Sequence, residues 1–272
     1  RFNKWYYFRH VHNLIYLKDH IFMIYTIICF LITAILYASV GFGGGSTYSA
    51  LLIISNVDYQ LIPKITLICN LIVVTGGVIR YQKKDLIPWR LALPLIAVSV
   101  PFAWLGGNTI IGKEAFLLML GTSLLFSGIL LIFRQKEITE FSEIIQTRLG
   151  IFLWSCVSVP LGFLSGLVGI GGGIFFSPLL HLSKIMPSKN IAAFASVFIF
   201  FNSIAGLTGQ FMKNNNAEIF NVALQYIWLF PVVLIGGQIG THLGIQAFRP
   251  IVVRRLTAVL VIFVGLRLLL VF

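Results

Sequence analysis

The chain contains Val40-Gly41-Phe42-Gly43-Gly44-Gly45, and 128 residues later it contains Val168-Gly169-Ile170-Gly171-Gly172-Gly173. Both stretches lie between long apolar segments. A run of glycines breaks an α-helix, because glycine has no Cβ and gains conformational freedom when the helix unwinds. Broken backbone within a hydrocarbon layer must face protein or a wet cavity, because its polar groups need partners there. Two matched breaks therefore predict a membrane fold in which unwound backbone lines a binding site.

Composition places this chain in a lipid bilayer. Of its 272 residues, 58% are hydrophobic and only 10% are charged, whereas soluble domains are closer to 25% charged. The mean hydropathy is +0.95. A soluble protein of this composition would expose too much apolar surface to stay dispersed. We therefore expect an all-α, polytopic membrane protein.

Apolar segments long enough to cross a bilayer recur along the chain. A helix rises 1.5 Å per residue, so about 20 apolar residues cover a hydrocarbon core of about 30 Å. Two further apolar segments follow the glycine runs at 44–55 and 172–185 and are too short to cross as straight helices. The predicted spans are residues 21–40, 63–80, 89–109, 115–133, 149–168, 190–211, 224–247 and 251–271.

The sequence indicates two copies of one structural unit. Beyond the glycine runs, further identical residues recur in the same order at a slowly increasing offset, as loop insertions would produce. We therefore predict a first membrane repeat at 21–133, a second at 149–271, and a basic, aromatic N-terminal segment at 1–20 that leads into a retained first span. The matched pairs are Asn70 with Asn202, Gly77 with Gly209, Pro94 with Pro231, Gly107 with Gly244 and Gly128 with Gly265.

The orientation of the two repeats stays open at this point. If the short segments do not cross and the N-terminus is inside, the repeats are parallel. If the short segments cross and the N-terminus is outside, the repeats are inverted. The balance of Lys and Arg between the two sides is the same in both arrangements, so the positive-inside rule does not separate them. Both arrangements place the links at 80–90 and 134–148 in the cytoplasm.

The glycine-rich element carries a family resemblance. The stretch from Gly162 to Gly173, followed by Ser177-Pro178-Leu179-Leu180, resembles the signature of the sulfite exporter TauE/SafE family. The last span, from Arg254 to Arg267, is also similar to that of the family. The resemblance implies a plasma-membrane permease for sulfur-containing or carboxylate anions such as sulfite or organosulfonates. The first repeat departs from the pattern, since Ser49-Ala50 stands where the second has Ser177-Pro178.

The residues that we expect to bind the substrate lie at the two breaks and in the middle of two spans. A helix start offers unpaired N–H groups and the positive end of the helix dipole to an anion. Amide side chains inside a span need a partner or a ligand, although helix–helix hydrogen bonding is an equally good interpretation. The predicted substrate-binding residues are Gly43, Gly44, Gly45, Ser46, Thr47, Asn70, Gly171, Gly172, Gly173 and Asn202. Weaker candidates are Gln210, Gln238, Ser165, Ser196, Ser203 and Thr208.

Charged side chains contribute little to this prediction. All eight acidic residues lie in links or at span ends, so a buried carboxylate relay for protons is not supported. Lys64 and Lys189 could attract anions, but we expect both to extend to the membrane interface. Arg267, within the last span, could neutralise an anion or reach the interface near the C-terminus. Neither a metal site nor a cofactor motif is present, because the three cysteines lie in separate spans and the glycine runs are not followed by Lys-Ser/Thr.

These observations favour a secondary transporter for a small anion, with H⁺ or Na⁺ as the coupling ion and the lipid bilayer as its surroundings. An anion channel with a fixed pore is the first alternative. A membrane-embedded assembly protein, in which the glycines only pack helices, is the second. The net charge of +12 comes mostly from links between spans, so nucleic-acid binding is excluded. An enzyme is not expected, since no catalytic constellation is present.

Overall fold

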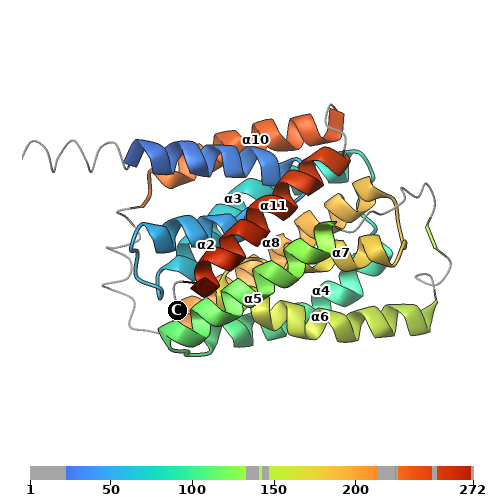
Figure 1. The fold of residues 1–272 in the computed structure, drawn as a ribbon. Helices are drawn as coiled ribbons and strands as arrows, with labels where there is room; N and C mark the ends of the chain where they lie inside the picture. Colours follow the sequence, from blue (N-terminus) through green and yellow to red (C-terminus); the bar gives the residue numbers. More distant parts are fainter. Residues whose placement is uncertain are drawn as a thin grey trace, which may run out of the picture.

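The computed structural model describes residues 23–132, 141–142, 147–213, 224, 226–246 and 250–270 (Figure 1). The predicted segment 1–20 and most of the link at 134–148 lie outside these residues. The described chain is all-α. Its helices are Met23–Ala38, α2 (Gly45–Ile54), α3 (Ile62–Lys83), α4 (Trp89–Asn108), α5 (Lys113–Ile132), α6 (Arg148–Val168), α7 (Gly173–Leu182), α8 (Ser188–Met212), α10 (Leu229–Gln246) and α11 (Pro250–Leu270).

The predicted membrane character is confirmed. Within the described residues, five helices are long and apolar enough to cross a bilayer, namely α3, α4, α5, α6 and α8. Large apolar side chains such as Phe126 and Phe152 are exposed on the outside of the bundle, where lipid would cover them. Serine, threonine and asparagine side chains are instead buried between the helices.

The two short helices follow the glycine runs, as predicted. Helices α2 and α7 have 10 residues each, which corresponds to about 15 Å, or half of a hydrocarbon core. Both are held by aromatic contacts. The ring of Tyr48 in α2 stacks on Phe30 at a centroid distance of 4.6 Å. Phe176 in α7 packs against Phe194 and Phe198 of α8, at 5.1 and 4.9 Å.

Small residues bring helices into backbone contact at two edges of the bundle. Gly162 and Gly166 of α6 face Ser99 and Ala103 of α4 so closely that a Cβ on either glycine would collide with a backbone carbonyl. At the opposite edge, three glycines of α10 face the helix Met23–Ala38 and the residue after it in the same way (Figure 1). Spacings of four residues between small side chains allow this close approach in membranes. The α10 glycines are Gly236, Gly240 and Gly244.

The central helices α3 and α8 lie between these two edges (Figure 1). They are antiparallel, because Gly77 faces Ser196 while Leu67 faces Gly206. Asn190, near the start of α8, donates a hydrogen bond to Leu86 O after the end of α3 (2.8 Å). Helices α5 and α11 are also antiparallel, because Gly121 faces Leu269 while Gly128 faces Ile262. The links 84–88 and 183–187 therefore lie on one face of the bundle, called here the 84–88 face. The opposite face is called the 55–61 face.

Candidate substrate site

The glycine runs form two tight turns, each followed by a short helix. Gly44 caps α2 with a φ of 91°, and Gly172 caps α7 with a φ of 78°. Both values lie in the left-handed region, which glycine adopts without the steric cost of a Cβ. The predicted breaks are thus present at both runs, and the short helices begin at Gly45 and Gly173.

The first turns of α2 and α7 leave backbone donors at these breaks. Thr47 N and Tyr48 N donate to Gly44 O, at 3.1 and 3.0 Å. Phe175 N and Phe176 N donate to Gly172 O in the same way, at 3.1 and 3.2 Å. The preceding N–H groups at each helix start have no acceptor within the helix. Each helix start therefore presents donors and the positive end of its dipole.

Asn70 joins the two glycine turns. Its Nδ2 donates to Gly169 O in the second turn at 3.5 Å, and a Cβ on Gly171 would lie 3.2 Å from the same nitrogen. A Cβ on Gly43, in the first turn, would collide with Asn70 Oδ1. A Cβ on Gly45 would lie 3.0 Å from Gly169 O. Two turns more than 120 residues apart in sequence thus meet at one asparagine of α3.

Asn202 occupies a different setting from Asn70. Its Nδ2 donates to Phe198 O of its own helix at 2.8 Å. Its neighbour Ser203 is the residue that lies against the second turn, with Oγ 3.1 Å from the Cβ position of Gly171. The structure therefore brings Asn70 to both turns directly, whereas on the α8 side it is Ser203, and not Asn202, that lies against Gly171.

Ser46 and Thr47 are engaged with Tyr37. The Ser46 hydroxyl donates to Tyr37 Oη at 3.1 Å, and the Thr47 hydroxyl lies 2.8 Å from the same oxygen. All three side chains are buried. These two residues connect α2 to the preceding helix. They lie at the break, as predicted, but their hydroxyl groups are already hydrogen-bonded to Tyr37.

Buried polar atoms without a hydrogen-bond partner gather around the turns. In the described residues these atoms are Tyr48 Oη, Asn70 Oδ1, Ser165 Oγ, Asn202 Oδ1 and Ser203 Oγ. Four of the five residues contact a glycine of a turn: Tyr48 lies against Gly44, Asn70 against Gly43, Ser165 against Gly172 and Ser203 against Gly171. Unpaired buried polar groups are costly, so their concentration at one place indicates a site for a ligand or water.

Hydroxyl groups of the central helices fix each turn from across the bundle. Thr66 of α3 donates to Gly169 O at 3.0 Å, and Ser196 of α8 donates to Gly41 O at 2.9 Å. Sequence analysis ranked Ser196 low and did not select Thr66. Thr66 lies four residues before Asn70, on the same face of α3, and that spacing could have identified it.

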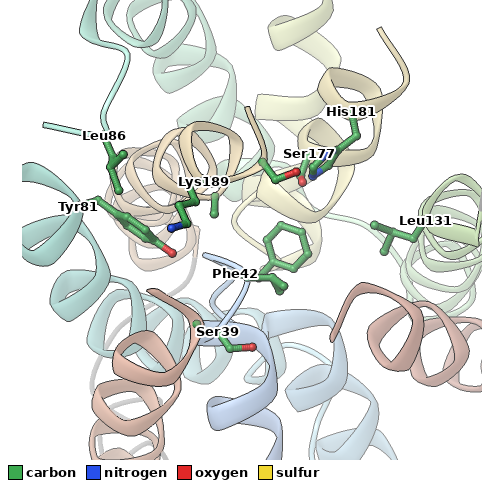
Figure 2. Close-up of a pocket in the computed structure, with 12 residues that line it drawn as sticks. Ser39, Phe42, Tyr81, Leu86, Leu131, Ser177, His181 and Lys189 are labelled. Carbon is green, nitrogen blue, oxygen red and sulfur yellow. The ribbon is translucent and has the colours of Figure 1, made fainter. Parts of the chain in front are cut away.

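Two pockets lead from the faces of the bundle toward the turns. The pocket at the 84–88 face has a volume of about 610 Å³ and contains Lys189, His181, Tyr81 and Phe42, the residue after Gly41 (Figure 2). Figure 2 shows the Lys189 amine directed toward the Tyr81 hydroxyl, with Phe42 in the centre of the view. Lys189 is exposed and thus lines a mouth of the bundle.

The pocket at the 55–61 face is smaller, at about 350 Å³. It is lined by Gln60, Gln210, Lys213 and Leu167, the last of which precedes Gly169 by two residues. Gln210 also donates to Gly166 O at 2.9 Å. Burial lowers the pKa of the Lys213 ammonium. No charged side chain of the described residues is among the nearest neighbours of the glycines in the two turns.

Two expectations about cations need correction. Lys64 is only 2% exposed, so the expectation that it extends to the interface is wrong. It lies on the face of α3 that packs against α8, which covers it. Arg267 is exposed on the outside of α11, away from the turns. It is not placed to neutralise an anion there.

The sequence of the chain matches a known protein family over most of its length. Residues 26–268 match the family model described as "Sulfite exporter TauE/SafE". The chain belongs to the TauE/SafE family. This match covers the glycine turns, all the central helices and both pockets, so the chain is a multi-pass membrane transporter of that family and not an enzyme.

Relatives of this TauE/SafE chain carry the same general description. It is 27% identical over 242 residues to the "Probable membrane transporter protein y4hK" of Sinorhizobium fredii, which covers 89% of this chain and 96% of that protein. It is 28% identical over 224 residues to the "Probable membrane transporter protein MJ0441" of Methanocaldococcus jannaschii, covering 79% and 82% respectively. No solved structure matches the chain.

Proposed function

We propose that this TauE/SafE protein is a secondary transporter that carries small sulfur-containing or carboxylate anions, such as sulfite or organosulfonates, and binds them between the two glycine turns. The observation that carries the proposal is the meeting of both turns at Asn70, with unpaired buried polar atoms around them. The description of the family as sulfite exporters supports the choice of substrate class.

The chemistry of the turns suits an anion that has lost part of its water. The starts of α2 and α7 supply backbone donors and two positive dipole ends. Asn70 and Ser203 add an amide and a hydroxyl that can donate. The described acids Asp58, Asp85 and Glu114 lie in links or at a helix end, so no carboxylate within the described spans repels the anion.

The packing supports two inverted halves, 21–133 and 149–271. If each helix of the first half is exchanged for its counterpart in the second, the pair α4–α6 becomes the pair of α10 with Met23–Ala38, and both pairs pack through close contacts between glycines and backbone. Under the same exchange α3 and α8 replace each other, and so do α5 and α11. Both of these pairs are antiparallel. Inverted repeats require a reversal of direction of this kind.

The moving bodies in this proposal are not the two halves of the sequence. Helices α4, α6 and α8 pack together, and so do α3, α10 and Met23–Ala38. Each group takes helices from both halves, so a half cannot rock without separating backbone contacts. Alternating access would arise from motion of one group against the other along α3 and α8, which opens one pocket as the other closes.

Uptake of radiolabelled sulfite into proteoliposomes tests the proposal, with sulfonates and carboxylates as competitors. We expect saturable uptake in the wild type that is driven by a Na⁺ or H⁺ gradient. Asn70→Ala should reduce the initial rate at least about tenfold, because it removes the amide at both turns, which corresponds to roughly 1.4 kcal/mol or more of lost stabilisation. The matched control is Asn108→Ala, at an exposed helix end away from the turns.

The alternatives give different results in the same preparation. A channel would give unsaturable flux and a conductance in planar bilayers. An assembly protein would give no flux for any anion, although the protein is folded and inserted. Wild-type activity in Asn70→Ala would reject the site while leaving transport itself intact.

A further inference from the structure

We propose that Lys64 and Lys213 form a second anion site at the 55–61 face, separate from the glycine turns, which captures the substrate before it reaches them. This proposal rests on the proposed transport of anions, and it specifies where an anion binds first. Lys64 lies in the first turn of the central helix α3 and is only 2% exposed, which is unusual for a lysine.

The two lysines face each other across the α3–α8 contact. Leu67 of α3 lies 3.5 Å from the Cβ position of Gly206 of α8. Because these helices are antiparallel, Lys64 lies one turn from Leu67 toward the 55–61 face, and Lys213 lies two turns from Gly206 toward the same face. The charge of Lys213 repels the Lys64 ammonium, and the charge of Asp58 attracts it.

No carboxylate of the described residues lies in direct contact with these lysines. Neither Lys64 nor Lys213 forms an ion pair within the described residues. Asp58 lies in the same region, but its Oδ1 accepts a hydrogen bond from Gln60 N at 2.9 Å, which fixes the turn before α3. Two neighbouring ammonium groups, one of them buried, repel each other and lack the partner that a buried charge needs. An anion supplies that partner.

The pocket beside Lys213 has the direction for this role. It is lined by Lys213, Pro63, Gln60 and Gln210, so amide donors lie next to Lys213, and Lys64 directly follows Pro63 in α3. Pro63 Cα is 2.5 Å from the Cβ position of Gly169, which brings the floor of the pocket to the second glycine turn. An anion held by the lysines would therefore be next to the proposed central site.

A cationic mouth raises the local concentration of anions and hence their rate of capture. The site should accept small oxyanions of the transported class, because its donors are two ammonium groups and amides. At the opposite face, Lys189 has the corresponding position beside Phe42 (Figure 2), but it is exposed, whereas Lys64, which follows the lining residue Pro63, is buried. We expect capture to be stronger at the 55–61 face.

The test is the kinetics of sulfite uptake by Lys64→Gln, Lys213→Gln and the double variant in proteoliposomes. We expect the KM of the double variant to rise about tenfold with a maximal rate within about twofold of wild type, and its kcat/KM to lose most of its dependence on ionic strength. Lys213→Arg should keep the wild-type KM. The control is Lys113→Gln, an exposed lysine on the same face that does not line the pocket.

Each result decides the inference. Wild-type KM and salt dependence in Lys213→Gln would overturn it, even if Lys64→Gln fails to fold, because Lys213 lies after the end of α8 and its replacement leaves the packed bundle intact. A fall in maximal rate with an unchanged KM would also overturn it, since that result indicates a structural role. Absence of saturable uptake in the wild type would instead reject the proposed function.

Discussion

Gly166 is the residue at which α6 approaches α4 most closely. A Cβ at this position would collide with Ala103 O and would lie 2.8 Å from Ala103 C and 2.9 Å from Gly107 N. These are backbone atoms, so no side chain can rotate to make room. The contact belongs to the packed edge that holds the α4, α6 and α8 group together.

We therefore predict that Gly166→Ala destabilises the protein by about 1–3 kcal/mol, the range for overpacked interiors. Thermal unfolding in detergent, followed by fluorescence-detected size-exclusion chromatography, would measure the change. Gly112→Ala is the control, because nothing lies within 4 Å of its Cβ position. Equal midpoints for the two variants would contradict the close packing of α4 and α6.

Thr66 gives a second prediction at the scale of one residue. Thr66→Val removes the hydroxyl that donates to Gly169 O and keeps the side-chain shape. We expect a loss of about 0.5–2 kcal/mol in stability and slower sulfite uptake, because the second turn loses its tie to α3. Thr75→Val on the same helix is the control, since its hydroxyl bonds only to Leu71 O of α3. Slower uptake in both variants would point to a general effect on the helix.

At the scale of an element, α7 is a short helix that depends on its aromatic contacts. Its 10 residues are too few for stable helix formation on their own. Phe176 is fully buried between Trp154 of α6 and the phenylalanines of α8. The position of α7, and with it the second set of backbone donors, is thus set by packing.

Phe176→Ala should cost about 3–5 kcal/mol, as for large-to-small changes in well-packed interiors. The expected result is a lower unfolding temperature and loss of uptake even where the protein remains inserted. Phe126→Ala is the matched control, since Phe126 is 59% exposed on the outside of α5. If Phe176→Ala retains full uptake, α7 does not need this anchor.

Element boundaries could be predicted well from sequence, but contacts between elements could not. The polar links and glycine runs limited each helix to within a few residues, so α2 and α7 were predicted at the right place. The different roles of Asn70 and Asn202 depend on segments about 100 residues apart, which no local pattern reveals. Lys64 was misjudged because its nearness to a span end suggested the interface, while its face of α3 is covered by α8.

At the scale of the whole molecule, the directions of the helices support the inverted arrangement of the proposed repeats over the parallel one. Antiparallel α3 and α8 place the links 84–88 and 183–187 on one face. With parallel repeats these links would lie on opposite faces. The charge balance could not reveal this, because it is the same in both arrangements.

Thiol labelling of intact cells tests this topology. In a background without the three native cysteines, Lys84→Cys and Ser183→Cys should react alike with a membrane-impermeant reagent, and Gly112→Cys should behave oppositely. If the 84–88 face is cytoplasmic, only Gly112→Cys is labelled before the cells are opened. Different labelling of Lys84→Cys and Ser183→Cys would contradict the inverted arrangement.

The contact between Gly240 of α10 and Ile35 O also bears on how the protein is made. Ribosomes add about 5–20 residues per second, so α10 leaves the ribosome roughly 10–40 s after its partner helix. During that interval the earlier helix resides in the bilayer with its packing surface facing lipid or a chaperone. Assembly of that edge is thus a late event, and truncated nascent chains that end before α10 should be targets for membrane quality-control proteases.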